Sequence, residues 1–277
     1  MDGALESMRL PPPVFEMEDV SYSYEHVVAL DTVGLAIPAG QRVALLGANG
    51  SGKSTLLRLL DGLCFAASGT VRFCGDPLSE ERFQDETLSF DFRRRVGLVF
   101  QNPDVQLFNP TVFDELAFGP LQLRWSRDLI RQRVAQTLDD LNIAHLKDRP
   151  PHRLSGGEKK RVAIASVLIL DPQVLLLDEP TAALDPRSQS QTIDLLAGWK
   201  ETGRTVVTAT HDLDSVEEIA DYCFVFHAGR LVAQGAPAAV LGDDDLLRRT
   251  GLLHAHRHAH APGEVHSHPH RHHDHPS

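Results

Sequence analysis

Eight residues between a short apolar run and a helical pattern constrain the fold of this chain more than any other feature. Residues 47–54 read Gly-Ala-Asn-Gly-Ser-Gly-Lys-Ser, which matches the pattern G-x-x-x-x-G-K-[ST]. The run 43–46 before them is typical of a buried parallel strand, and 53–61 after them has a helical pattern that Gly62 ends. Glycines let main-chain N–H groups surround phosphate oxygens, and a helix N-terminus favours an anion. The motif in this context predicts a phosphate-binding loop.

Two carboxylates follow a second apolar run and extend the predicted site. Residues 174–177 are Val-Leu-Leu-Leu, typical of a buried strand, and Asp178 and Glu179 come directly after them. Charges at the end of a buried strand are costly unless a metal or a partner compensates them. We therefore predict that Asp178 and the Ser54 hydroxyl bind Mg²⁺. Lys53 is predicted to reach the β- and γ-phosphates, and Glu179 to polarise a water.

Strand-like and helical runs alternate along the chain, which favours an α/β fold with a mainly parallel sheet. Strands are predicted at 70–74 and 96–100, with only a polar stretch between them. From 101 to about 155 the sequence turns helical, and Ser126 is placed to cap one of its helices. The predicted organisation is a leader at 1–13, a nucleotide-binding domain at 14–242 with this helical subdomain inside it, a connector at 243–253 and a disordered tail at 254–277.

Charge and cysteine content exclude several classes of protein. The formal net charge is −11, unlike the basic face of a general nucleic-acid binder, so no nucleic-acid partner is expected. Cys64, Cys74 and Cys223 lie far apart, which fits reduced thiols in a cytosolic protein better than a zinc site or a disulfide framework. No stretch approaches the roughly 20 apolar residues that cross a bilayer, and the N-terminus lacks a secretory pattern. Any role at a membrane is therefore expected to require a partner.

A second anion-binding helix start is predicted at Ser155, Gly156, Gly157 and Glu158, which we call the signature segment. Ser155 is placed as an N-cap, and the two glycines leave main-chain N–H groups accessible. One nucleotide needs only one phosphate loop, so a second such site is best used on a neighbouring molecule.

With these motifs the chain resembles an ATP-binding-cassette (ABC) ATPase over about residues 14–240. The resemblance implies a P-loop NTPase fold with a RecA-like core, an antiparallel β subdomain and an inserted helical subdomain. It also implies a dimer, with itself or with a sister ATPase, that binds two ATP molecules. Each ATP then lies between the phosphate loop of one subunit and the signature segment of the other. Glu158 departs from the glutamine of many relatives, which keeps the side-chain length but adds a negative charge.

The resemblance assigns roles to further residues. Glu179 resembles the family's general base, and His211 resembles the histidine that contacts the γ-phosphate. Gln101 resembles the glutamine that joins the Mg²⁺ site, with Ser54 and Asp178, to the helical subdomain. Asp185 belongs to the segment that lines the dimer seam. Tyr24 resembles the aromatic residue that stacks on adenine, with Tyr22 as a neighbouring alternative. The residues assigned to ATP binding are Tyr24, Gly47, Ala48, Asn49, Gly50, Ser51, Gly52, Lys53, Ser54 and Thr55.

The segment 96–120 narrows the class of cassette. It reads VGLVFQNPDVQLFNPTVFDELAFGP, which resembles the energy-coupling-factor ATPases, above all those of nickel and cobalt uptake systems. The apolar residues after Gln101 (Val105, Leu107, Phe108 and Phe113) either pack inside the helical subdomain or form a groove for a partner's helix.

The tail adds a second indication of a metal. It holds ten of the fifteen histidines, mixed with Pro, Gly, Ser and Arg, so it offers no core. Imidazole suits Ni²⁺ and Co²⁺, and alternating histidines on one flexible segment can bind a single ion together. A solvating tail and a purification tag are the alternatives, although tags are continuous. The candidate ligands are His254, His256, His258, His260, His266, His268, His270, His272, His273 and His275.

These features together predict an ATP-hydrolysing subunit that powers nickel or cobalt import from the cytoplasmic face of the cell membrane. ATP and Mg²⁺ are its expected ligands. A transmembrane coupling subunit and a substrate-binding membrane subunit are its expected partners. Three alternatives stay open: an energy-coupling-factor ATPase for vitamin uptake, a soluble cassette ATPase without a transport role, and a metal buffer with an ATPase attached. The absence of a long coiled-coil insertion and of a second cassette in this sequence disfavours the soluble class.

Overall fold

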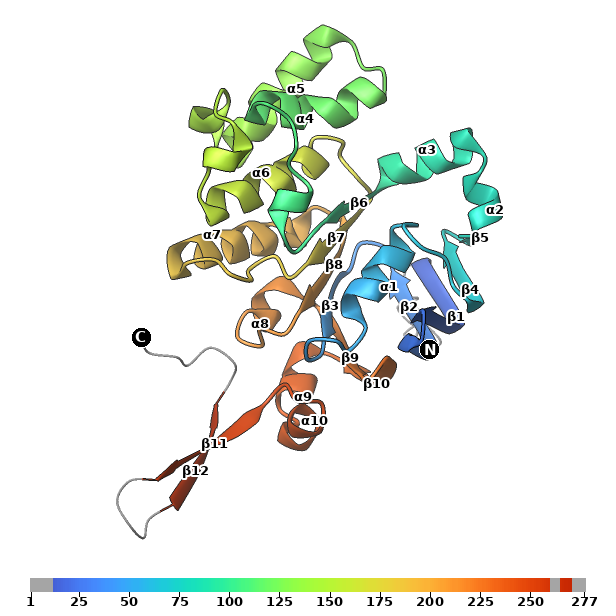
Figure 1. Cartoon of the computed structure of the whole chain (residues 1–277), viewed down its shortest axis with the longest axis vertical. Helices are drawn as coiled ribbons and strands as arrows, with labels where there is room; N and C mark the ends of the chain where they lie inside the picture. The colour runs from blue at the N-terminus through green and yellow to red at the C-terminus, as the bar shows by residue number, and fades with distance from the viewer. Residues whose placement is uncertain (1–11, 260–264, 271–277) are drawn as a thin grey trace, which may run out of the picture.

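The centre of the protein is a six-stranded sheet (Figure 1) in a computed structural model that describes residues 12–259 and 265–270. The strand order is β10-β9-β3-β8-β7-β6. The strands from β9 to β6 are parallel, whereas β10 pairs antiparallel with β9. Their bounds are Arg42–Leu46 (β3), Val96–Val99 (β6), Val174–Asp178 (β7), Thr205–Thr210 (β8), Tyr222–His227 (β9) and Arg230–Gly235 (β10). The predicted α/β core with a mainly parallel sheet is confirmed.

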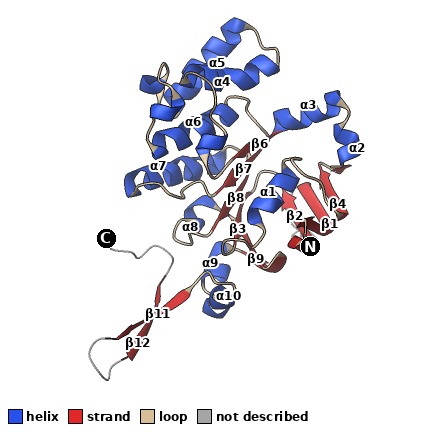
Figure 2. Ribbon diagram, in the orientation of Figure 1, coloured by secondary structure: helices blue, strands red, loops and turns tan. Residues whose placement is uncertain are grey.

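Helices cover both faces of this sheet (Figure 2), as its fully buried strands require. Because side chains alternate along a strand, Val43 and Leu45 of β3 lie in one core cluster, and Ala44 and Leu46 lie in another. The first cluster contains α1, and the second contains α7 and α8. The bounds are Lys53–Leu60 for α1, Pro186–Ala197 for α7 with a 3-10 extension at Gly198–Glu201, and Val216–Ile219 for α8.

A second, antiparallel sheet packs on the cluster that contains α1, which confirms the predicted antiparallel β subdomain. Its strand order is β2-β1-β4-β5. Phe15 of β1 is fully buried there, with its ring centroid 5.1 Å from that of Phe73. The bounds are Pro13–Tyr24 (β1), Val27–Pro38 (β2), Ser68–Phe73 (β4) and Asp76–Pro77 (β5).

The helical subdomain contains α4 and α5 and shares its core with α6. Leu116 of α4, Val134 of α5 and Ile164 of α6 belong to one buried cluster, so the helical layer continues beyond residue 155. Ser126 caps α5 as predicted, since its hydroxyl accepts from the main-chain N–H of Leu129. The bounds are Val112–Gln122 (α4), Arg127–Asp140 (α5) and Gly156–Leu168 (α6), with 3-10 turns at Pro103–Val105, Ala144–Leu146 and Pro151–Arg153.

Two helices occupy the stretch that the sequence identifies only as polar. They are α2 (Glu80–Phe83) and α3 (Glu86–Arg95). Side chains cap both, because Ser79 accepts from Arg82 N and Asp85 accepts from Thr87 N. In α3 only Phe92 is buried, so no apolar stripe marks this helix in the sequence.

The C-terminal part forms two short helices and a hairpin. The helices are α9 (Pro237–Leu241) and α10 (Asp244–Arg249), and the strands are β11 (His254–Ala259) and β12 (Val265–His270). The sequence predicts no order for the tail, whereas β11 and β12 pair with each other in a separate two-stranded sheet. The predicted leader up to residue 11 lies outside the described residues, as do His260, His272, His273 and His275. Among the described helices, none is both long enough and apolar enough to cross a membrane.

Candidate nucleotide-binding site

The predicted site residues follow the carboxyl ends of four neighbouring parallel strands. The phosphate loop follows β3, Gln101 lies just beyond β6, Glu179 follows β7 and His211 follows β8. Parallel strands place these ends at one edge of the sheet, which is where ligands bind in open α/β sheets. The fold therefore brings together segments that are more than 150 residues apart in the chain.

The phosphate loop places Lys53 in a buried position at the start of α1. Gly52 has φ = 108°, and a Cβ atom there would come within 2.6 Å of the carbonyl oxygen of Ala29, so only glycine fits. The Lys53 side chain is 5% exposed, and its Nζ donates to the carbonyl oxygens of Gly47 at 2.6 Å and Ala48 at 3.3 Å. Burial lowers the pKa of Lys53, although the neighbouring carboxylates oppose that shift. The ammonium group thus lies across the loop that the motif assigns to phosphates.

Ser54 and Asp178 meet as predicted for a Mg²⁺ site. The Ser54 hydroxyl donates to Asp178 Oδ1 at 3.0 Å. Burial raises the pKa of Asp178, and the charge of Glu179 adds to that effect, while the hydrogen bond from Ser54 opposes it. A hydroxyl and a carboxylate oxygen this close, beside the phosphate loop, are the hard oxygen ligands that Mg²⁺ prefers. These residues therefore fit the ion.

Glu179 lies between two basic groups. Its carboxylate is 5% exposed, and Oε1 lies 2.9 Å from Nδ1 of His211 and 3.5 Å from Nζ of Lys53. Burial alone raises the pKa of Glu179, but the His211 hydrogen bond and the charge of Lys53 outweigh it, so the pKa is lowered. The same hydrogen bond raises the pKa of His211. Glu179 also adopts φ = 45°, and its N–H donates to the carbonyl of Ala209.

Tyr24 stands next to α1. Its hydroxyl accepts from Arg58 Nη1 at 3.0 Å and lies 3.5 Å from Thr55 Oγ1. Its ring is 39% exposed and meets the edge of Tyr22 at 5.0 Å between centroids. An exposed aromatic ring beside the helix that follows the phosphate loop is suited to stacking on a base. Among the hydrogen bonds of the described residues, Tyr24 is joined to α1 and Tyr22 is not.

The signature segment begins α6 and is separate from the phosphate loop of its own chain. Ser155 and Glu158 form a capping box, with Glu158 Oε2 accepting from Ser155 N at 2.8 Å. The main-chain hydrogen bond from Ser155 lowers the pKa of Glu158. Glutamate and glutamine can both form a capping box, so the departure from glutamine at this position keeps the cap. Among the hydrogen bonds and ion pairs of the described residues, none joins this segment to Lys53 or Glu179.

Asp185 is the N-cap of α7. It caps α7 by accepting from the main-chain N–H groups of Arg187 and Ser188, each at 3.1 Å, and from the Ser188 hydroxyl at 2.6 Å. Ser188 packs so closely on Gly157 that a Cβ atom at Gly157 would clash with it. The cap therefore supports the start of the signature helix, while a role of Asp185 at a dimer seam stays a prediction.

Sequence reasoning missed two residues that hold the main chain around Gln101. Lys160 is 1% exposed, and its Nζ donates to the carbonyl oxygens of Gln101 at 2.7 Å and Phe100 at 3.1 Å. Burial lowers the pKa of Lys160 to about 8. Gln106 accepts from Phe100 N and donates to the carbonyl of Ala163 in α6. Gly157, Lys160 and Ile164 are spaced three and four residues apart and so lie on one face of α6, which is buried. This spacing is the sequence feature that could have indicated a buried lysine.

The apolar residues after Gln101 divide between core and surface. Val105 and Phe108 are 68% and 67% exposed, whereas Leu107 is buried and Phe113 packs against the core. A separate groove of about 730 Å³ lies between α3 and the α4–α5 junction. Its apolar lining includes Phe90, Leu121 and Trp125.

Known proteins with similar sequences identify the family. Residues 30–182 match the family model described as ABC transporter. Nickel import ATP-binding protein NikO of Rhodobacter capsulatus is 58% identical, over 87% of this chain and 96% of the relative. Cobalt import ATP-binding protein CbiO of the same organism is 46% identical over 87% and 85%. Energy-coupling factor transporter ATP-binding protein EcfA of Methanothermobacter thermautotrophicus is 41% identical over 86% and 76%.

Solved structures agree with the fold. CbiO1 of Clostridium perfringens, part of the ABC transporter complex cbiONQ, superposes with a TM-score of 0.75 at 40% identity, over 87% of this chain and 95% of that one. The dimeric cassette MJ0796, in a post-hydrolysis state with ADP and phosphate, gives 0.71 at 28% identity over 80% and 98%.

The phosphate loop, the two carboxylates and the signature helix define a P-loop ATPase of the cassette type. With the family match and these relatives, the chain belongs to the ABC transporter family, and it is an ATPase.

Proposed function

We propose that this chain is the ATP-hydrolysing subunit of an energy-coupling-factor transporter that imports nickel or cobalt ions. The observation that supports it most is the likeness to the nickel and cobalt import proteins over nearly their whole length. The subunit would lie on the cytoplasmic face of the membrane, bound to a transmembrane coupling subunit and, through it, to a substrate-binding membrane subunit.

In the proposed cycle two subunits close on two ATP molecules. Lys53 and the main-chain N–H groups of the loop bind the phosphates of one ATP, and Ser155, Gly156 and Gly157 of the other subunit complete the site. The γ-phosphate attracts Lys53 and His211, which now lie against Glu179. Glu179 then accepts a proton from the attacking water. Ser54, Asp178 and Gln101 would hold a Mg²⁺ ion, which would supply compensation of the negative charge of the triphosphate.

The exposed residues Val105 and Phe108 and the groove lined by Phe90 and Trp125 are the proposed contact with the membrane subunit. Apolar side chains rimmed by polar ones suit the apolar face of an amphipathic helix. Val105 and Phe108 follow Gln101 within seven residues, which supports coupling, because movement at the ATP site would reach them through a short stretch of main chain.

Metal binding by the tail is a second proposed activity, and the register of the hairpin favours it. In the main-chain register of the ladder, His254 is paired with His270, His256 with His268 and His258 with His266. Three histidine pairs at alternate positions suit Ni²⁺ or Co²⁺. The proposed role is metal storage or sensing near the transporter.

Uptake of radiolabelled Ni²⁺ and Co²⁺ in cells that express the transporter with or without this chain tests the proposal. We expect uptake of one ion to require the chain and to fail with Glu179→Gln. If the chain is required for uptake of a vitamin instead of a metal, the result would favour an energy-coupling-factor ATPase for vitamin uptake. If removal of the chain leaves all uptake unchanged, the result would favour a soluble ATPase. Deleting residues 254–277 tests the tail: unchanged uptake at all metal concentrations would contradict a role in supply.

A further inference from the structure

Lys160 is the most deeply buried cation of the described chain outside the phosphate loop. Its side chain is 1% exposed, and no carboxylate of the described residues lies within ion-pair distance of it. A lysine is almost never fully buried without a partner, because desolvation of its charge is costly. Its position therefore needs an explanation that packing alone does not give.

The acceptors of Lys160 supply that explanation. Its ammonium donates to two successive carbonyl oxygens, those of Phe100 and Gln101. Lys160 belongs to α6, and the N-cap of this helix is Ser155, five residues earlier. Charge-assisted hydrogen bonds are about twice as strong as neutral ones. Lys160 thus ties the main chain of Gln101 to the signature helix.

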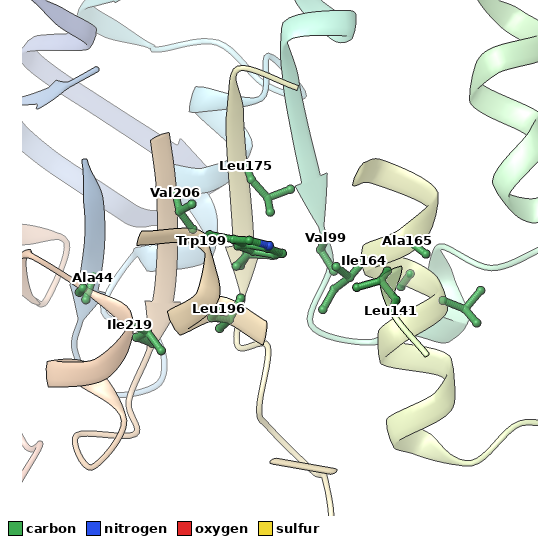
Figure 3. Close-up of a cluster of buried hydrophobic side chains, with 14 of the residues drawn as sticks. Ala44, Val99, Leu141, Ile164, Ala165, Leu175, Leu196, Trp199, Val206 and Ile219 are labelled. Atoms are coloured by element: carbon green, nitrogen blue, oxygen red, sulfur yellow. The ribbon is translucent and has the colours of Figure 1, made fainter. Parts of the chain in front are cut away.

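Two further contacts hold the same short segment. Gln106 accepts from Phe100 N at 3.1 Å and donates to Ala163 O at 2.9 Å. The N–H of Phe100 is therefore bound by Gln106, and its carbonyl oxygen is bound by Lys160. Val99, the last residue of β6, lies beside Ile164 of α6 in the shared core (Figure 3). The end of β6 and the first turns of α6 therefore form one packed unit.

We propose that Lys160 is a positioning residue that makes Gln101 and the signature segment move as one body. Gln101 belongs to the ATP site of its own chain, and Ser155 belongs to the ATP site shared with the partner, so this tie would link the two sites of the dimer. The proposal rests on the proposed function of Gln101 and Ser155. Lys160 touches neither nucleotide nor metal and acts through the main chain of Gln101.

The test compares Lys160→Met, Lys160→Arg and Gln101→Ala, singly and as the double variant Lys160→Met with Gln101→Ala, in the full-length chain. We expect Lys160→Met to bind ATP in the absence of Mg²⁺ as the wild type does. Its kcat should fall about tenfold or more, and the Mg²⁺ concentration for half-maximal activity should rise. Lys160→Arg, which keeps the charge and the donors, should recover part of both. Hydrogen exchange of the Phe100 and Gln101 amides should accelerate in Lys160→Met.

The double variant distinguishes the possible failures. If Lys160 acts through Gln101, Lys160→Met should cost nothing more in the Gln101→Ala background. Full additivity of the two losses, or unchanged kcat and Mg²⁺ dependence in Lys160→Met, would overturn the inference. Full activity of Gln101→Ala would instead contradict the proposed role of Gln101. Should Lys160→Met fail to fold, Lys160→Gln with the exchange measurement gives the same decision. Lys200→Met is the matched control, since Lys200 is exposed on the 3-10 turn after α7 and makes no hydrogen bond or ion pair with Gln101 or α6 among the described residues, so kcat and the Mg²⁺ dependence should stay unchanged.

Discussion

Replacing Glu179 by glutamine separates the chemical step from nucleotide binding. The Glu179 carboxylate is nearly buried and lies 2.9 Å from His211 Nδ1 and 3.5 Å from Lys53 Nζ. Glutamine has the same size and still offers an oxygen to both groups, so the fold and the phosphate loop should keep their geometry. What the variant loses is a group that can accept a proton from water.

The expected size of the effect follows from that single loss. General-base catalysis contributes typically 10²–10⁴-fold, which corresponds to about 3–5 kcal/mol of transition-state stabilisation at 1.36 kcal/mol per tenfold. We therefore expect kcat of Glu179→Gln to fall by about 10²–10⁴-fold while the Kd for ATP changes less than threefold, roughly 0.6 kcal/mol. Because hydrolysis reopens the dimer in the proposed cycle, the ATP-bound dimer should also accumulate.

Single-turnover phosphate release with radiolabelled ATP measures the first quantity, and titration with a fluorescent ATP analogue measures the second. Sedimentation with ATP reports the dimer. Glu217→Gln is the matched control, because Glu217 is exposed on α8 and the same chemical change there should leave all three values unchanged. Retention of more than about a tenth of wild-type turnover by Glu179→Gln would refute the assignment of Glu179 as the base.

Three further outcomes are expected. Lys53→Met should weaken ATP binding about tenfold or more in equilibrium titrations, since a hydrogen bond to a charged group contributes about 1.5–3 kcal/mol; unchanged affinity would count against the phosphate loop. Gly157→Ala should lower ATPase activity but leave ATP binding by the isolated chain intact, because the added methyl group displaces the signature helix from Ser188; full activity would show that the helix start tolerates the shift. The pair of His211 and Glu179 should stabilise the fold fully between their ordinary pKa values of 6.5 and 4.5, and less as the pH rises through the raised pKa of His211 or falls through the lowered pKa of Glu179. Urea unfolding should accordingly show a smaller gap between wild type and His211→Gln at about pH 9 than at about pH 5.5, and a constant gap would contradict the pairing.

The phosphate loop and the two carboxylates at the end of β7 were predictable because their geometry is local. A strand, a glycine-rich turn and a helix in direct succession leave few conformations, and the residues that fix them are adjacent in the sequence. The contact of Glu179 with His211 was not predictable in this way. It depends on the register in which β7 pairs with β8, where Asp178 lies opposite Ala209.

Two features were not predicted from the sequence: helix α3 and the burial of Lys160. Helix α3 buries only Phe92, so its formation depends on the cap at Asp85 and on packing against Phe73 and Phe83. Lys160 was missed for the opposite reason: a lysine in a sequence predicts exposure, and only the two carbonyl oxygens that the fold brings to its ammonium make burial tolerable.

The two basic groups beside Glu179 also suggest how the basicity of the proposed base would change when ATP binds. With Lys53 and His211 both against Glu179, the pKa of the carboxylate is lowered, and a carboxylate with a lower pKa is a weaker base. A triphosphate carries more negative charge than one carboxylate, so it competes for both cations when it binds. In the proposed cycle, movement of the two cations toward the triphosphate would raise the basicity of Glu179 when a γ-phosphate is in place. We therefore infer that the two charges proposed to bind the γ-phosphate also lower the basicity of Glu179 before ATP binds, so that the same two contacts would serve both binding and timing.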